Sequence, residues 1–350
     1  MRRADLASLD AEGESNAFPS QCVRPSIQRC QIPRRARNFR APLLPVKNPL
    51  VRLFFVFLLT ACGASAADKK ILLIAGPPSH GPGQHEHNAG ILLIQKCLAG
   101  TPGLKTEVTL GGWPNNPTAF TDAAAIIIFA DGGARHIALQ DDHLAVLEKA
   151  LSRGAGLGLL HYAVEPTLAK GQVEFLRWVG GAFEVHWSVN PHWDAAFTSL
   201  PSHPITHGVK PFTIRDEWYF NLRFVDAMQG VTPLLVAQPD ASTTTRPDGD
   251  HSGNATMRAQ VARGDPQIVS WAFERPNGGR GFGFTGAHFH ANWGNDDFRK
   301  LVLNAALWLA KMEVPADGVK SSLTPAELAA NLDPKAAAKK AATKKVEPTK

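Results

Sequence analysis

The stretch Gly156-Leu-Gly-Leu-Leu-His-Tyr-Ala-Val-Glu-Pro166 (GLGLLHYAVEP) decides the fold class of this 350-residue chain. Its short apolar run is typical of a strand that is buried on both faces of a parallel sheet. The run ends on His161, where the chain turns out of the sheet. Similar apolar runs occur at 70–75 (KILLIA) and 124–130 (AAIIIFA), and segments with helical spacing separate them.

The order of these elements predicts an α/β fold. We expect strands at 70–75, 105–110, 124–130, 156–161, 193–198, 231–237, 267–274 and 281–285, and helices that end near 98 and that cover 139–153 and 297–311. This alternation favours an open, mostly parallel sheet with helices on both faces. Ligands of such folds bind beyond the carboxyl ends of the strands.

The two ends of the chain are set apart from the body, which we place at 68–315. Residues 1–67 are interpreted as a leader, in which Arg52 precedes the apolar run LFFVFLLTA and a lipobox ends at Cys62. An exported, periplasmic or membrane-anchored lipoprotein is therefore expected, and small residues at 64–66 (ASA) leave a soluble exported form as the alternative. Residues 1–45 are unlike a signal peptide and are interpreted as a gene-model extension. The Lys/Ala-rich residues 316–350 are predicted to be a disordered tail.

Charge and cysteine content exclude several classes of protein. The chain has a net charge of +6, but residues 1–61 carry +6 and residues 321–350 carry +3, which leaves −3 on the body. A nucleic-acid-binding domain carries its basic patch on the folded part, so we expect no nucleic-acid partner. Cys97 is the only cysteine of the body, and its apolar helical surroundings indicate a buried small residue. No internal disulfide is expected.

The histidines are the main candidates for chemistry. They cluster in GPPSHGPGQHEH after the first strand, at the end of GLGLLH, in EVHWSVNPHWD, and in TGAHFHANW after the strand at 281–285. Loops that follow parallel strands open on the same edge of a sheet, so these clusters can be neighbours in space. His80, His161 and His288 are the candidate ligands of a divalent metal. If the last strand continued, His288 and His290 would point to one side.

A second group of residues is expected to supply acid–base or substrate-binding side chains. Glu217 and Tyr219 place a carboxylate beside a phenol, which suits a general base and a polarising group. Tryptophans adjoin the histidine and glutamate clusters, so Trp187 and Trp293 could stack on sugar rings, although core packing explains an isolated tryptophan equally well. The loop at 76–87 fits no phosphate-binding motif, so we expect no nucleotide.

Several segments together resemble the ThuA-like (trehalose utilisation) family. They are KILLIAGPPSHGPGQHEH, IIIFADGG, GLGLLHYA, VGGAFEVHW, SHPITHGV, DEWYFNLRF and GGRGFGFTGAHFHANW, and they extend over about residues 69–311. The resemblance implies a fold similar to class I glutamine amidotransferases, a flavodoxin-like three-layer α/β sandwich. Amidotransferases present a cysteine at the turn where this chain presents His161, so glutamine hydrolysis through a thioester is excluded.

The resemblance also implies a link to carbohydrate use and to oxidised (3-keto) disaccharides. It makes His161, Glu217 and His288, with Tyr219, the candidate catalytic residues. The candidate substrate contacts are His87, Tyr162, Trp187, His290 and Trp293.

Two functions remain open at this stage. The first is an exported enzyme that acts on a sugar or 3-keto-glycoside as a lyase, isomerase or hydrolase, with assistance from a divalent metal. The second is a non-catalytic carbohydrate-binding lipoprotein. Both have a small-molecule carbohydrate as partner, and both touch the membrane only through a lipid anchor. The oligomeric state is not predicted.

Overall fold

The computed structural model describes residues 68–335, so the expected leader, the lipobox at Cys62 and the tail beyond 335 lie outside the described residues. Its centre is a seven-stranded sheet in the order β2-β1-β3-β4-β11-β10-β9. The strands are β1 (Lys69–Ala75), β2 (Leu104–Thr109), β3 (Ala123–Phe129), β4 (Gly156–Leu160), β9 (Val231–Ala237), β10 (Gln267–Glu274) and β11 (Arg280–Phe284). Neighbours from β2 to β11 run parallel, and β10 is antiparallel to β11 and β9.

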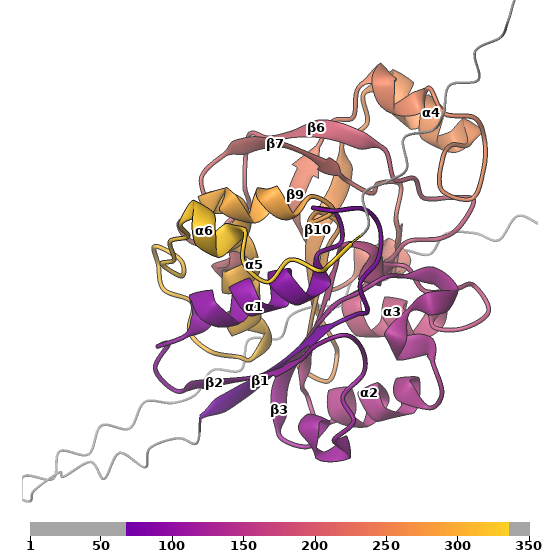
Figure 1. The fold of residues 1–350 in the computed structure, drawn as a ribbon. Coiled ribbons are helices and arrows are strands. Elements are labelled where there is room, and N and C mark those ends of the chain that lie inside the picture. The colour runs from indigo at the N-terminus through magenta and orange to yellow at the C-terminus, as the bar shows by residue number, and fades with distance from the viewer. Residues whose placement is uncertain (1–67, 336–350) are drawn as a thin grey trace, which may run out of the picture. The chain divides into compact units, whose positions relative to one another are not determined.

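Helices cover both faces of this sheet, which makes a three-layer sandwich. Figure 1 shows α1 (His87–Leu98) and α5 (Asp296–Leu309) on one side of the strands and α2 (His143–Ser152) and α3 (Gln172–Val179) on the other. The remaining helices are α4 (Ala255–Arg263) and the single turn α6 (Pro325–Leu328). The predicted α/β class, with a mostly parallel sheet and helices on both faces, is confirmed.

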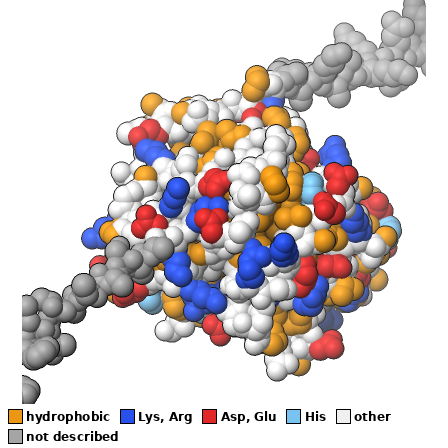
Figure 2. All heavy atoms as spheres, turned by 90° about the horizontal axis from the view of Figure 1, so that it is seen from below, with side chains coloured by type: hydrophobic (Ala, Val, Ile, Leu, Met, Phe, Trp, Pro, Cys, Tyr) orange, Lys and Arg blue, Asp and Glu red, His pale blue; other side chains and the backbone are white. Residues whose placement is uncertain are grey.

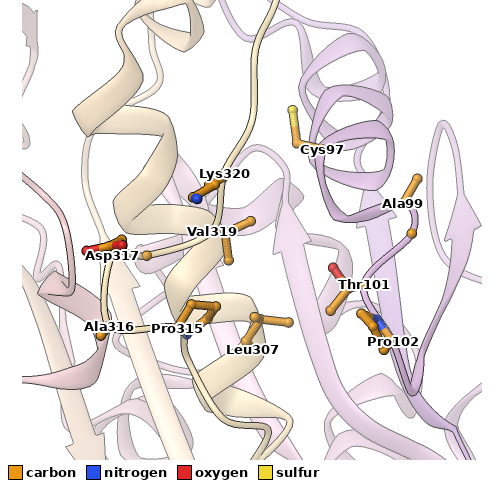
Figure 3. Close-up of a pocket in the computed structure, with 12 residues that line it drawn as sticks. Cys97, Ala99, Thr101, Pro102, Leu307, Pro315, Ala316, Asp317, Val319 and Lys320 are labelled. Atoms are coloured by element: carbon orange, nitrogen blue, oxygen red, sulfur yellow. The ribbon is translucent and has the colours of Figure 1, made fainter.

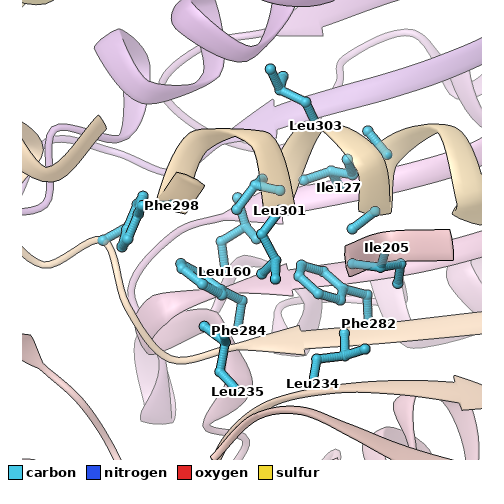
Figure 4. Packing of buried hydrophobic residues seen from close by; sticks show 14 of the residues in the cluster. Ile127, Leu160, Ile205, Leu234, Leu235, Phe282, Phe284, Phe298, Leu301 and Leu303 are labelled. Carbon is cyan, nitrogen blue, oxygen red and sulfur yellow. The ribbon is translucent and has the colours of Figure 1, made fainter. Parts of the chain in front are cut away.

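The alternation of side chains along each strand builds two hydrophobic cores. On β1, Ile71 and Leu73 belong to the core under α1 and α5, and Leu72 and Ile74 belong to the core under α2 and α3. Successive side chains of a strand point to opposite faces, so a central strand covered on both sides must be apolar throughout. Figure 4 shows α5 lying over β4 and β11, with Leu301 directed at Leu160 and Phe284.

The glycines of GLGLLH allow α5 to approach the sheet closely. A Cβ atom on Gly156 would lie 2.4 Å from the backbone oxygen of Leu309, and one on Gly158 would lie 3.0 Å from a methyl carbon of the same leucine. Any larger residue would push the helix off β4. The strand is therefore held against α5 at the point where it delivers His161.

Two small antiparallel sheets lie outside the main sheet. One pairs β6 (His192–Phe197) with β7 (Phe212–Glu217), and the other pairs β5 (Gly181–Ala182) with β8 (Arg223–Phe224). The hairpin β6–β7 packs on β9, and Glu217 is the last residue of β7.

On the face shown in Figure 2, basic and acidic side chains are interspersed rather than gathered by sign.

The structure differs from the sequence-based expectation for part of the C-terminal tail. Residues 316–335 fold back onto the body, and Thr324 caps α6 with a reciprocal hydrogen bond to Glu327. Lys335 Nζ lies 3.2 Å from Glu86 Oε1, and both side chains are buried. The backbone N–H of Asp333 donates to Glu86 Oε2 at 2.8 Å. This segment therefore braces the loop that precedes α1, a contact that the Lys/Ala-rich composition did not suggest.

Among residues 68–335, no helix combines the length and the apolarity that a membrane crossing requires.

Candidate functional site

Four side chains from distant parts of the chain converge at the carboxyl edge of the parallel strands. His85 lies in the loop after β1, His161 directly follows β4, and His288 lies in the loop after β11. Glu217 enters from the end of β7. Because β1, β4 and β11 run in the same direction, the three loops open on one edge, as the sequence suggested.

The ligand atoms of these four residues are close enough to share one ion. His85 Nε2 lies 3.0 Å from His161 Nε2 and 3.0 Å from His288 Nδ1. Glu217 Oε2 lies 3.2 Å from His288 Nδ1 and 3.5 Å from His161 Nε2. A tetrahedral ion with metal–nitrogen bonds of about 2.0–2.1 Å holds its ligand atoms roughly 3.3 Å apart. The four atoms all lie within 4.8 Å of one another, so the set could hold a divalent metal.

Second hydrogen bonds fix the tautomers of two of these histidines. His85 Nδ1 donates to Asp131 Oδ1 at 2.9 Å, and His161 Nδ1 donates to the backbone oxygen of Thr285 at 2.8 Å. A carboxylate and a carbonyl can only accept, so the proton of each neutral ring resides on Nδ1. In these tautomers neither Nε2 atom carries a proton, and the two atoms lie 3.0 Å apart.

Burial keeps these imidazoles neutral. It lowers the pKa of His85 to about 3 and lowers the pKa of His161 well below its ordinary value. Burial opposes ionisation of Glu217, but hydrogen bonds with His192 and His288 outweigh it and hold the pKa of the carboxyl below its usual range. Neutral imidazoles and an ionised carboxylate are the protonation states in which these groups bind metals.

Glu217 uses its two oxygens differently. Oε2 faces the histidines and accepts from the Tyr219 hydroxyl at 3.3 Å. Oε1 accepts from Asn190 Nδ2 at 3.2 Å and lies 3.5 Å from His192 Nε2. Burial raises the pKa of Tyr219 well above its usual value, so the phenol remains a neutral donor. Its oxygen also lies 3.4 Å from His161 Nε2.

The loop that carries His288 is held by one buried carboxylate. Asp216 accepts from the backbone N–H groups of Ala287 at 2.7 Å, of His288 at 3.1 Å and of Phe289 at 3.4 Å. It also accepts from the Glu217 N–H at 2.8 Å and from Asn292 at 2.9 Å. Asp216 is completely buried, and five donors converge on it. This residue ties the end of β7 to the loop after β11.

Backbone strain accompanies the convergence of the histidines. His85 has φ 46°, His161 has φ 55° and Ala287, next to His288, has φ 87°. Left-handed backbone at a residue with a side chain costs on the order of 1–3 kcal/mol and persists where the surroundings demand it. At His161 the strain marks the turn from β4 into the short 3₁₀ helix His161–Val164, which aims the ring back across the sheet edge.

The structure brings together His161, His288, Glu217 and Tyr219, as the sequence suggested, and adds His85 to them. His80 lies instead in a second set that could hold a metal, with His85 and Asp131. His80 stacks on the ring of His85 with centroids 3.6 Å apart and is one-third exposed. His87 is fully buried, bonds to the Pro77 oxygen at 3.0 Å and lies 3.8 Å from Asp131 Oδ1. Tyr162 lies beside the cluster, with its ring centroid 6.1 Å from that of His85.

Three predicted substrate contacts lie elsewhere. The expectation for His290 is wrong because β11 ends at Phe284; His290 bonds instead to the Leu328 oxygen at 2.9 Å. Trp293 is fully buried against Phe129 and Phe298 and belongs to the core. Trp187 lies under the Arg223 guanidinium, 3.6 Å from its ring centroid.

Sequence reasoning missed Asp131, the partner of His85, and Asn190, the partner of Glu217. Asp131 had a usable signal, since it is the first acidic residue after the buried strand β3 and so sits at the same sheet edge. Hydrogen bonds from His85 and Ser79 outweigh burial and hold the pKa of Asp131 below its usual range. Nothing local distinguished Asn190.

Two cavities were compared as possible places for the functional site. One of about 390 Å³ opens beside Glu217 and His192. Another of about 430 Å³, shown in Figure 3, lies between the end of α1 and the segment 315–320 and is lined by Cys97, Leu307 and Val319. The second cavity lies beside the start of β2, at the edge of the sheet opposite the histidines, and is mainly apolar. We therefore place the functional site at the first.

Fold and site together define an α/β protein of amidotransferase-like architecture that carries histidine at the strand-to-helix turn. The family model ThuA, described as trehalose utilisation, matches residues 72–309. That is more than half of the chain, so the protein belongs to the ThuA family and is associated with carbohydrate use. The resemblance noted in the sequence is confirmed.

One solved structure supports the fold, and the similarity to a second is weaker. A ThuA-like protein from Bacteroides uniformis ATCC 8492 is 15% identical, with a TM-score of 0.50 over 70% of this chain and 93% of the other. A ThuA-like protein from Parabacteroides merdae ATCC 43184 is 12% identical, with a TM-score of 0.48 over 71% and 92%. A comparison with curated protein sequences found no match.

The role of Asp216 is testable by Asp216→Asn. The variant loses one of the two acceptor oxygens and presents amide hydrogens to backbone donors, so we expect the free energy of unfolding to fall by about 2–4 kcal/mol. Urea denaturation measures the change. Asp194→Asn, at an exposed position on β6, is the control and should lie within about 0.5 kcal/mol of wild type. A loss below about 1 kcal/mol for Asp216→Asn would contradict the assigned role.

Proposed function

We propose that this protein is an exported carbohydrate-active enzyme that acts on a sugar or 3-keto-glycoside at a divalent metal centre formed by His85, His161, His288 and Glu217. The observation that carries the proposal is the 3.0 Å separation of the His85 and His161 Nε2 atoms, because both rings bond through Nδ1 to groups that can only accept. Such a contact is repulsive unless a cation lies between the two atoms. The low pKa values of both rings disfavour a shared proton as that cation.

The donor set also suits a catalytic rather than a structural metal. Histidines with a carboxylate are typical of catalytic zinc and related sites. Because four protein ligands fill a tetrahedral shell, water or substrate would bind as a fifth ligand. Hydrogen bonds from the non-ligating nitrogens orient the rings, as Asp131 and the Thr285 carbonyl do here. For His288, Nε2 is buried without a partner among the described residues, so this ring is held less firmly than the other two.

A bound metal would supply Lewis acidity that polarises a carbonyl or activates a water molecule. The protein's own groups would handle the proton. A 3-keto group acidifies the neighbouring C–H, so one base near an electrophile can start elimination or isomerisation. His192 lies 3.5 Å from Glu217 Oε1 at the cavity and is placed to accept that proton. The neutral Tyr219 hydroxyl can donate a hydrogen bond to a developing oxyanion.

Two other functions receive less support. Glutamine hydrolysis needs a thiolate at the turn after β4, where the chain has His161, and Cys97, the one cysteine among residues 68–335, lies on α1. A carbohydrate-binding platform needs exposed aromatic faces, but Trp293 is buried and Trp187 is covered by Arg223. Export rests on the sequence of residues 52–62 alone.

Metal content tests the proposal. Mass spectrometry of the purified protein should find about one divalent ion per chain, and His85→Ala, His161→Ala and His288→Ala should each reduce it at least tenfold. His290→Ala is the matched control, because this histidine lies two residues from His288 but outside the cluster, and it should keep its metal. Circular dichroism establishes that each variant is folded. A metal-free parent protein would contradict the metal centre.

Asp131→Asn tests the orienting role of the second hydrogen bond. The substitution removes the negative acceptor for His85 Nδ1–H, so we expect metal affinity to fall by about 10–100-fold with the four ligands intact. Competition with a chromophoric chelator measures the affinity. Arg135→Ala removes only the exposed partner of Asp131 and should change the affinity by less than about threefold. Equal affinities for Asp131→Asn and wild type would refute this role.

A further inference from the structure

The cavity beside Glu217 contains a guanidinium that the proposed chemistry does not use. Asn190, His192 and Glu217 line one side of this space of about 390 Å³, and Thr245 and Arg246 line the other. The second side belongs to the polar segment 238–254, which includes the 3₁₀ helix Ala241–Thr244. The segment thus forms a wall of the site, although its sequence is that of an ordinary loop.

Arg246 is held in a defined position relative to Glu217. Its Nη2 donates to Asn190 Oδ1 at 3.0 Å and to the His251 backbone oxygen at 3.0 Å. The amide nitrogen of the same Asn190 donates to Glu217 Oε1 at 3.2 Å. Asn190 therefore fixes the Arg246 guanidinium and the Glu217 carboxylate relative to each other. The guanidinium is held in place before any ligand binds.

The charge of Arg246 has no partner within the described part of the chain. No carboxylate oxygen there lies within 4.0 Å of the guanidinium, and Nε is buried without an acceptor. Nη1 forms no hydrogen bond and is not among the buried unpartnered atoms, so it remains accessible at the cavity. A half-buried guanidinium cannot lose its proton and is costly to leave unpaired.

Glu217 is the nearest carboxylate that could balance the charge of Arg246. In the proposed metal centre, however, Glu217 is a metal ligand. With the carboxylate neutralised by a divalent ion, the cavity presents an excess positive charge at Arg246. We infer that the cavity is a subsite for the carboxylate of an acidic sugar, a uronate or aldonate unit, with Arg246 as its anchor. The free Nη1 group can donate a charge-assisted hydrogen bond to one carboxylate, and the hydroxyl groups of Ser242 and Thr245 around it suit the rest of a sugar. The inference rests on the proposed carbohydrate function and names its substrate class.

Calorimetric binding of a matched pair of sugars tests the inference. Methyl β-D-glucuronide and methyl β-D-glucoside differ only in the carboxylate, and both are titrated into the metal-supplemented protein. A charge-assisted hydrogen bond contributes about 1.5–3 kcal/mol, so we expect the glucuronide to bind roughly 10–100-fold more tightly. Arg246→Gln should remove this preference and leave glucoside affinity within about threefold. Arg246→Lys should retain part of the preference.

A matched control and the contrary results complete the test. Arg263→Gln removes an exposed arginine on α4 that pairs with Asp265, and it should leave the preference unchanged. Equal binding of both sugars by wild type would overturn the acidic subsite and leave the carbohydrate function standing. Equal loss of both sugars in Arg246→Gln would show a structural role and would also overturn it. Binding of neither sugar would contradict both proposals, and metal content of the same samples would then decide whether the metal centre survives.

Discussion

The chemistry of the site depends on two hydrogen bonds that His85 and His161 donate to groups outside it. Because Asp131 and the Thr285 carbonyl take the Nδ1 protons, His85 and His161 must present bare nitrogens to each other. Burial then removes protonation as a way to relieve the contact. In a protein interior an unrelieved lone-pair contact is unfavourable, and a cation is the simplest partner for it. His288 and Glu217 complete the set of ligand atoms around this pair, and Tyr219 donates a hydrogen bond to Glu217.

The fold supplies this constraint through close packing and local strain. Glycines on β4 allow α5 to pack closely against the strand. The left-handed backbone at His161 then places its imidazole across the edge of the sheet. Asp216 holds the loop after β11, while the bridge between Lys335 and Glu86 braces the loop that holds His85. These contacts hold the four ligand atoms within 4.8 Å of one another.

Much of this organisation could be predicted from the sequence, because it follows from hydrophobic periodicity. The boundaries of the eight expected strands agree to within one residue, but β5, β7 and β8 were not expected. His161 and His288 were found because each follows a buried strand. His85 was not among the expected ligands, because the hydrogen bond to Asp131 that turns its ring inward joins residues distant in the sequence. His290 does not share a side with His288 because β11 ends at Phe284 and a 3₁₀ helix begins at His290. Partners distant in sequence, such as Asn190, depend on tertiary packing that no local pattern reports.

The central claim is that His85 and His161 carry their protons on Nδ1 and offer Nε2 to a cation. Long-range ¹H–¹⁵N NMR of the metal-free protein, labelled at histidine, measures this directly. The account predicts two buried rings in the Nδ1–H form between pH 6 and pH 8, whose Nε2 resonances shift when zinc is added. A proton on Nε2 of either ring, or Nε2 resonances that do not respond to zinc, would contradict it.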